Sequence, residues 1–105
     1  MPVVHLVFLK LDPAKDSAPV FAALRSLKGA IPGLLDFSGG PNCSTEGLGG
    51  YSHAFSMVFE SAEARDAYLP HPAHLAAKEV VLSHLEPGAA TPVSVVDVAF
   101  GAGGK

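Results

Sequence analysis

The chain opens with an almost unbroken apolar run, Val3-Val4-His5-Leu6-Val7-Phe8-Leu9, which only His5 interrupts. A short run so rich in β-branched and aromatic residues is typical of a buried strand, and Asp12-Pro13 ends it, so we expect a strand over residues 2–11. Because neighbouring residues of a strand point to opposite faces, this strand is apolar on both sides. It therefore predicts a sheet with cover on both of its faces.

Apolar spacing and turn residues predict six further elements, in the order helix, strand, strand, helix, helix, strand. We place them at residues 17–31, 34–38, 51–59, 61–68, 72–85 and 92–100, with a Gly-rich loop over 39–50 as a rim and a frayed tail at 101–105. When the two adjacent helices count as one unit, the order is β-α-β-β-α-β. This is the α+β ferredoxin-like arrangement, with a four-stranded antiparallel sheet.

The helices of such a fold cover only one face of the sheet. The first strand is apolar on both faces, and the last strand, with Val93, Val95, Val96, Val98 and Phe100, is nearly so. An uncovered face of this kind would leave several hundred Å² of apolar surface in water. Closed two-fold dimers are the commonest soluble oligomers, so we expect a homodimer that packs sheet against sheet.

Composition narrows the class of protein. The 105 residues suit a single domain, with a core over about residues 3–100. The net charge of −3 and seven scattered basic residues argue against nucleic-acid binding. No apolar segment is long enough to span a membrane, and no signal peptide is recognisable. The one cysteine, Cys43, fits a reducing compartment, so we expect a cytoplasmic protein.

Several candidate catalytic residues, one tyrosine and two histidines, lie in one short segment, Tyr68-Leu69-Pro70-His71-Pro72-Ala73-His74. The prolines predict that one helix ends near Tyr68 and that another begins at Pro72, where we expect His71 to cap the helix or to face solvent. His74 then lies in the first turn, where the helix dipole disfavours an imidazolium. A neutral imidazole beside a phenol suits proton transfer, although a packed corner can hold the same pair for structural reasons.

His5 and His53 are the other candidates. Strand parity directs both imidazoles to the helix-covered side, where we expect them to approach Tyr68 and His74 in one pocket. The alternative is a buried hydrogen-bond network that ties the corner to the sheet. The histidines lack the spacing of a zinc site, so we expect no metal there.

Five segments, taken together and in order, resemble the stress-responsive A/B barrel (Dabb) family of the dimeric α+β barrel superfamily. They are Val4–Lys10, Ile31-Pro32-Gly33, Gly50–His53, Phe59-Glu60-Ser61 and Tyr68–His74, within roughly residues 3–98. The resemblance implies a dimeric barrel of ferredoxin-like protomers. It also extends to olivetolic acid cyclase-type polyketide cyclases, which close a linear tetraketide by aldol condensation without a cofactor.

The resemblance implies a role for each candidate residue. His74 would be the general base, and Tyr68 would orient it or donate to the developing enolate, whereas His5 and His53 would bind carbonyl or hydroxyl oxygens of the substrate. In some relatives a structural magnesium ion lies on backbone carbonyls, which here correspond to Lys28, Ile31 and Leu34.

Three functions stay open at this point. The first is a cofactor-independent, cyclase- or lyase-like enzyme that acts on a small aromatic or polyketide-like ligand. The second is a stress-responsive or ligand-binding protein without catalysis, and the third is a cofactor-free monooxygenase. All three need a pocket with a few polar groups.

Overall fold

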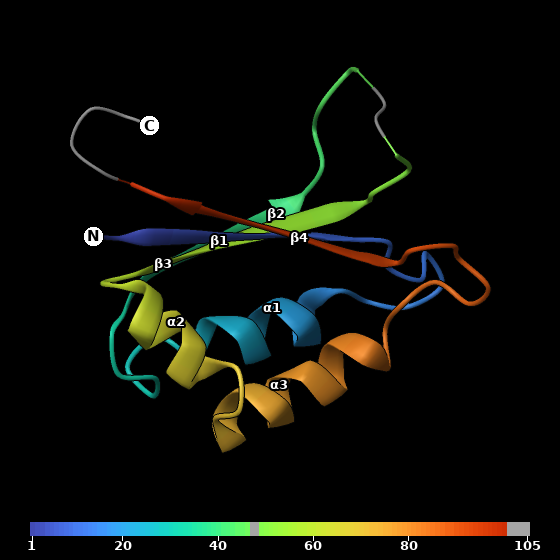
Figure 1. Cartoon of the computed structure of the whole chain (residues 1–105). Coiled ribbons are helices and arrows are strands. Elements are labelled where there is room, and N and C mark those ends of the chain that lie inside the picture. The colour runs from blue at the N-terminus through green and yellow to red at the C-terminus, as the bar shows by residue number, and fades with distance from the viewer. Residues whose placement is uncertain (47–48, 101–105) are drawn as a thin grey trace.

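The computed structural model describes residues 1–46 and 49–100, which form four strands and three helices (Figure 1). In chain order these are β1 (Val3–Leu9), α1 (Ala18–Arg25), β2 (Leu34–Pro41), β3 (His53–Phe59), α2 (Ala62–Tyr68), α3 (Pro72–Leu82) and β4 (Val93–Ala99). The strands make one antiparallel sheet in the order β2-β3-β1-β4. The ferredoxin-like prediction is confirmed.

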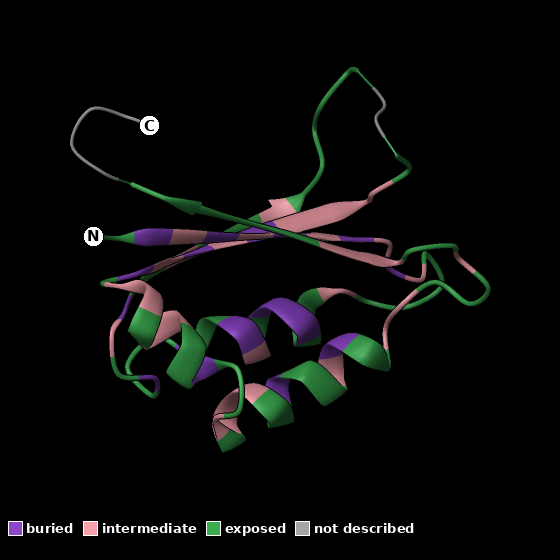
Figure 2. Cartoon of the chain, in the orientation of Figure 1, coloured by how far each residue is buried: buried purple, intermediate pink, exposed green. Residues whose placement is uncertain are grey.

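The three helices lie on one side of the sheet, and the hydrophobic core fills the space between the two layers (Figures 1 and 2). Burial alternates along β1, and its odd-numbered residues face the helices. Leu9, Met57 and Phe59 from the two central strands are fully buried, as are Val20 of α1 and Tyr68 at the end of α2. The alternation of apolar residues thus places one face of each central strand in the core.

The opposite face of the sheet has no layer over it in the described chain (Figure 1). The even-numbered residues of β1, Val4, Leu6 and Phe8, are only partly buried there. On the neighbouring edge strand, Val96 and Val98 are 47% and 41% exposed. This apolar surface is the one that the sequence predicts for the second face of the first strand.

Several predicted boundaries differ from the structure. The helix expected to reach Ile31 ends at Arg25, and residues 26–30 form turns in which Gly29 has a φ of +95°. The strand expected to end at residue 38 continues to Pro41. Part of the predicted rim loop, residues 39–41, is therefore strand, because Gly39 packs closely on β3: a Cβ there would lie 2.8 Å from the Cβ of Phe55.

The remaining elements keep their predicted positions with shorter ends, which fray readily. The third helix stops at Leu82 rather than near Leu85, and the last strand covers Val93–Ala99. Residues 47–48 of the predicted rim and the predicted tail, 101–105, lie outside the described residues. No helix within the described part is long and apolar enough to cross a membrane.

Candidate functional site

A cavity of about 260 Å³ lies between α3 and the helix-facing side of β1 and β4, and it contains three of the four predicted site residues. His5 reaches it from β1, Tyr68 from the end of α2, and His74 from the first turn of α3. The rest of its wall is mainly apolar and includes Val81 and Val95. A small, mostly apolar hollow with a few convergent polar groups is typical of a ligand site.

The two-proline corner brings Tyr68 and His74 together. The backbone turns between α2 and α3, and the His71 ring caps α3 by accepting a hydrogen bond from the backbone N–H of Ala73 at 3.0 Å. The predicted capping role of His71 is confirmed. As a result the rings of Tyr68 and His74 lie against each other, with centroids 4.1 Å apart.

One hydrogen bond sets the tautomer of His74. Its Nδ1 lies 2.9 Å from the carbonyl oxygen of Leu69, and a carbonyl can only accept, so Nδ1 carries the hydrogen. In the neutral ring Nε2 then holds a free electron pair. Burial lowers the pKa of His74, and Lys78, His5 and His71 lower it further, against the Leu69 hydrogen bond, which raises it. A lowered pKa of His74 agrees with the prediction from the sequence. The predicted cause is the helix dipole, whereas burial is the largest cause in the structure.

Tyr68 is almost fully enclosed, with 1% of its surface exposed. Burial raises the pKa of its phenol, because a phenolate would lose its hydration, so the hydroxyl keeps its proton at neutral pH. None of the hydrogen bonds between described residues uses this hydroxyl, and no fully buried side-chain polar atom among those residues lacks a partner. The hydroxyl is therefore accessible from the cavity as a donor.

His5 belongs to a chain of three polar side chains at the edge of the core. Its Nδ1 donates to Oδ1 of Asp97 over 2.6 Å, and the other carboxylate oxygen of Asp97 accepts from Arg65 over 2.7 Å. The ring of His5 lies 5.9 Å from that of Tyr68, centroid to centroid. A carboxylate on Nδ1 holds the imidazole in one orientation and leaves Nε2 for a ligand.

Asp97 and Arg65 are absent from the sequence-based site. Asp97 is the one charged residue in a mostly apolar strand, and that signal could have found it. The contact between Asp97 and His5 could not be predicted in the same way, because it depends on the register between β1 and β4.

His53 does not join the other three residues, so the prediction of one shared pocket is wrong for this residue. His5 pairs with Met57, whereas His53 pairs with Leu9 at the far end of the strands. Four residue steps at 3.3 Å each separate the two histidines by about 13 Å. Parity places them on one face of the sheet, but it carries no information about distance along the strands.

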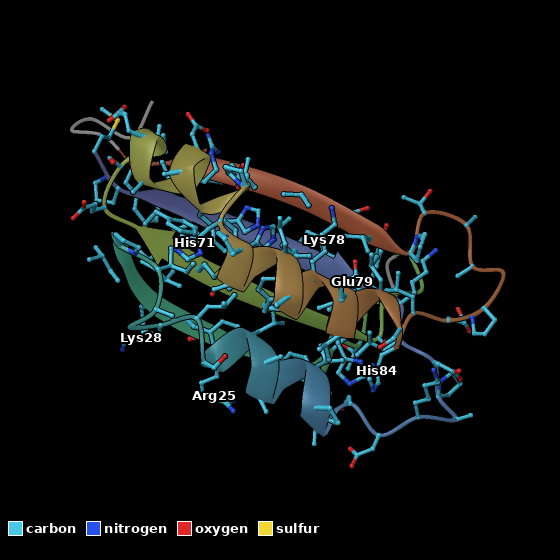
Figure 3. The ribbon with its side chains drawn as sticks, turned by 90° about the horizontal axis from the view of Figure 1, so that it is seen from below. Arg25, Lys28, His71, Lys78, Glu79 and His84 are labelled. Atoms are coloured by element: carbon cyan, nitrogen blue, oxygen red, sulfur yellow. The ribbon has the colours of Figure 1, made fainter. Side chains whose placement is uncertain are left out.

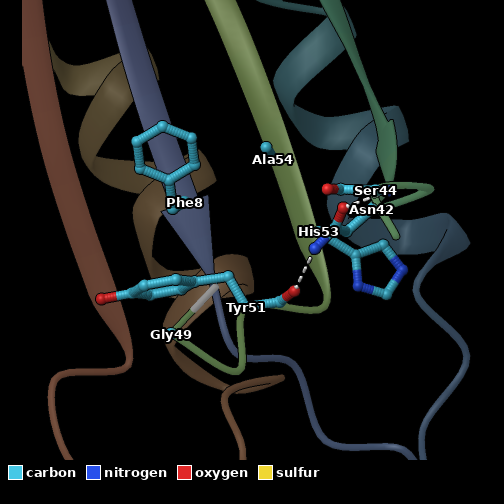
Figure 4. A pocket seen from close by; sticks show the side chains of 7 residues that line it. All are labelled: Phe8, Asn42, Ser44, Gly49, Tyr51, His53 and Ala54. Carbon is cyan, nitrogen blue, oxygen red and sulfur yellow. Dashed lines mark hydrogen bonds between the residues drawn. The ribbon is translucent and has the colours of Figure 1, made fainter. Parts of the chain in front are cut away.

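His53 instead borders a second hollow, of about 360 Å³, beside the loop before β3 (Figure 4). Its ring turns away from Phe8 and Tyr51 and packs against Phe21 of α1, with centroids 5.6 Å apart. Nδ1 lies 2.8 Å from the hydroxyl oxygen of Ser52, and burial lowers the pKa of the imidazole. These contacts place His53 at the end of the core, and its expected role in substrate binding stays a prediction.

Tyr51 also differs from the prediction, which groups it with His53 on one strand face. Because β3 begins only at His53, strict alternation does not extend back to Tyr51. The Tyr51 ring lies beside Phe8, 5.9 Å away, and its hydroxyl bonds to the backbone of Thr91 and to Ser94.

The structure describes no group of three or more His, Cys, Asp or Glu residues, within 1–46 and 49–100, that could hold a metal ion. The possible magnesium ligation by the carbonyls of Lys28, Ile31 and Leu34 stays a prediction. The Ile31 carbonyl already accepts a hydrogen bond from the N–H of Leu34 at 3.2 Å, which occupies one of its two lone pairs.

Several solved structures share this fold. A dimeric ferredoxin-like protein of unknown function from Jannaschia sp. CCS1 is 30% identical, with a TM-score of 0.79 over 95% of this chain and 100% of the other. At3g17210 from Arabidopsis thaliana is 27% identical, with a TM-score of 0.81 over 94% and 95%. The hydroxynitrile lyase from Passiflora edulis is 16% identical, with a TM-score of 0.77 over 95% and 94%, and shows likeness of fold only.

No curated protein matches the chain. The family model for the stress-responsive A/B barrel domain (Dabb) matches residues 3–100, almost the whole chain. This match and the 30% identical dimeric structure agree with the ferredoxin-like topology described above. The chain therefore belongs to the stress-responsive A/B barrel (Dabb) domain family.

Proposed function

We propose that this protein is a cofactor-independent enzyme that moves a proton next to a carbonyl group, with His74 as general base and Tyr68 as hydrogen-bond donor. The observation that carries the proposal is the contact of a neutral imidazole with a protonated phenol at one small apolar cavity. Acid–base catalysis needs a base that is free of its proton next to a donor that keeps its proton, and His74 and Tyr68 meet these two requirements.

The reaction step follows from the atoms available. Nε2 of His74 takes a proton from the carbon beside the carbonyl, and the C–H electron pair moves to form an enolate. The Tyr68 hydroxyl donates a hydrogen bond to the enolate oxygen as negative charge develops there. His5, held through Nδ1 by Asp97, contributes Nε2 to accept a hydrogen bond from a substrate hydroxyl. The enolate then takes the proton back from the His74 imidazolium, or it attacks a second carbonyl within the same molecule, as in a cyclase, and the alkoxide that forms takes that proton.

The relatives support enzymatic use of this fold without naming this reaction. The Passiflora edulis protein is a hydroxynitrile lyase, whereas the Jannaschia protein is of unknown function. Likeness to polyketide cyclases rests on the sequence motifs alone. His53, which those motifs place in substrate binding, takes no part in the proposed step, because it lies at the other end of the strands.

The test is proton exchange at the carbon next to the carbonyl of a neutral ketone, 2-butanone, followed by NMR in D₂O. We expect the protein to speed the exchange, His74→Gln to abolish that effect, and Tyr68→Phe to reduce it by about 10²-fold. His84→Gln is the matched control, because His84 lies at the other end of α3, with Nδ1 2.8 Å from the Val80 carbonyl.

Thermal melts of the same variants separate catalysis from a structural role. If the residue is retained for activity, His74→Gln should fold and melt near the parent temperature. No exchange by the parent, or equal exchange by parent and His74→Gln, would overturn the proposal in favour of a protein that binds without catalysis.

We also propose that the protein works as a homodimer. The uncovered sheet face presents Val96 and Val98, and three similar solved structures are described as dimeric. Burial of this face between two copies would complete the α+β barrel.

A further inference from the structure

We propose that Lys78 makes the cavity selective for a substrate that carries a carboxylate a few bonds away from the reacting carbonyl. The inference rests on the proposed function, because it assumes that His74 and Tyr68 mark the position of that carbonyl. It adds the charge of the substrate, which neither the fold nor the family match indicates.

Lys78 lies one helical turn after His74 on α3, so the two side chains leave the same face of the helix. It is part of the cavity wall, together with Val93 and Val95 of β4. In Figure 3, Lys78 is labelled on the β4 side of α3, whereas Glu79, its neighbour in sequence, is labelled over the helix itself. Lys78 is exposed and also lines the cavity, and its charge is close enough to His74 to lower the pKa of that imidazole.

The ammonium group of Lys78 is available to a ligand. Among the ion pairs of the described residues, none includes Lys78. Asp97, the nearby carboxylate on the helix-facing side of β4, uses one oxygen for His5 and the other for Arg65. A bound anion would therefore meet a free cation and would not have to displace an internal partner.

The remaining walls define the rest of the ligand. Apart from His5, Tyr68, His74 and Lys78, the side chains around the cavity are aliphatic or aromatic. One ammonium suits a singly charged carboxylate, whereas a phosphate is usually held by several donors. A small keto acid fits these three regions of the cavity. Its carbonyl would lie at His74 and Tyr68, its carbon chain would contact the apolar wall, and its carboxylate would pair with Lys78.

The experiment compares levulinate, a keto acid, with its neutral methyl ester. Both dissociation constants are measured by NMR titration of the whole protein at pH 7.5 and low salt, since salt screens exposed charges. We expect the parent to bind levulinate about three- to fivefold more tightly than the ester, the scale of one partly exposed ion pair. Lys78→Gln should remove the preference without changing ester binding, and Lys78→Arg should keep it.

Lys28→Gln is the matched control, because it removes the same charge from a lysine that lies away from the cavity and near Asp36 (Figure 3). The inference is overturned if Lys78→Gln keeps the preference, if Lys28→Gln loses it equally, or if the parent binds neither compound or does not distinguish them. These outcomes concern binding alone. Failure of the proposed function would appear separately, in the exchange of the uncharged 2-butanone.

Discussion

At the scale of single residues, the site depends on two groups held in unfavourable surroundings. A half-buried imidazole and a buried phenol meet at a cavity, and burial lowers the pKa of His74 while it raises that of Tyr68. Both shifts favour the neutral forms. At neutral pH His74 can therefore accept a proton and Tyr68 can donate a hydrogen bond, and their burial links the site to the stability of the fold.

Stability should fall with pH below about neutrality, because burial lowers the pKa of both His74 and His53 from its ordinary value of 6.5. As the pH drops through 6.5, the unfolded chain takes up protons before the folded chain does, so the free energy of unfolding decreases until the lowered pKa values are passed. Urea unfolding between pH 8 and 5.5 measures this. His74→Phe should flatten the dependence, and an unchanged slope would contradict the burial argument.

Gly33 is a second residue whose identity is constrained. Its φ is +80°, and a Cβ there would lie 2.6 Å from the Cβ of Ala64 on α2. Gly29 also has a positive φ, of +95°, but open space around it. We expect Gly33→Ala to cost about 2–3 kcal/mol and Gly29→Ala about 1 kcal/mol, both measured by urea unfolding at one protein concentration. Equal losses would show that the contact with α2 does not matter.

At the scale of elements, the corner between α2 and α3 positions the proposed base. Ser61 caps α2 by accepting a hydrogen bond from the N–H of Ala64, and His71 caps α3 through the N–H of Ala73. Both caps satisfy N–H groups that a helix cannot pair within itself. Because His74 belongs to the first turn of α3, the start of that helix also sets the orientation of the imidazole.

Loss of the His71 cap should therefore affect stability and site together. We expect His71→Ala to lower the free energy of unfolding by about 1 kcal/mol, and His71→Asn, a preferred cap, to restore most of it. The exchange rate with 2-butanone should follow the same order. If the asparagine variant is no better than the alanine variant, the ring of His71 does more than cap the helix.

At the scale of the whole molecule, the helices leave one sheet face uncovered, and the proposed dimer would bury it. Light scattering at micromolar concentration should give about twice the chain mass of 10.8 kDa. Phe8→Asp should dissociate the dimer or prevent folding, because it places a charge in an apolar interface. Leu75→Asp is the control, since Leu75 is 48% exposed on α3. A monomeric parent would rule out the barrel.

The sequence by itself determined the order of the elements, their type and the face on which most side chains lie. These properties follow from local periodicity and from turn residues, such as the prolines at 70 and 72, so a short window of sequence contains them. The contact between Tyr68 and His74 is of this kind, because only the corner separates the two residues. Membership of the Dabb family was also visible in the order of the motifs.

Only the tertiary structure decided which distant residues meet. Asp97 binds His5 through the register of β1 and β4, although 92 residues separate them in sequence. His53 shares a face with His5 but pairs four positions further along β1, so it lies at a different hollow. Lys78 lines the cavity together with Val93 and Val95 because α3 lies over the sheet on the side of β4 (Figure 3). Register and packing arise from contacts between distant segments, and periodicity along one segment carries no record of them.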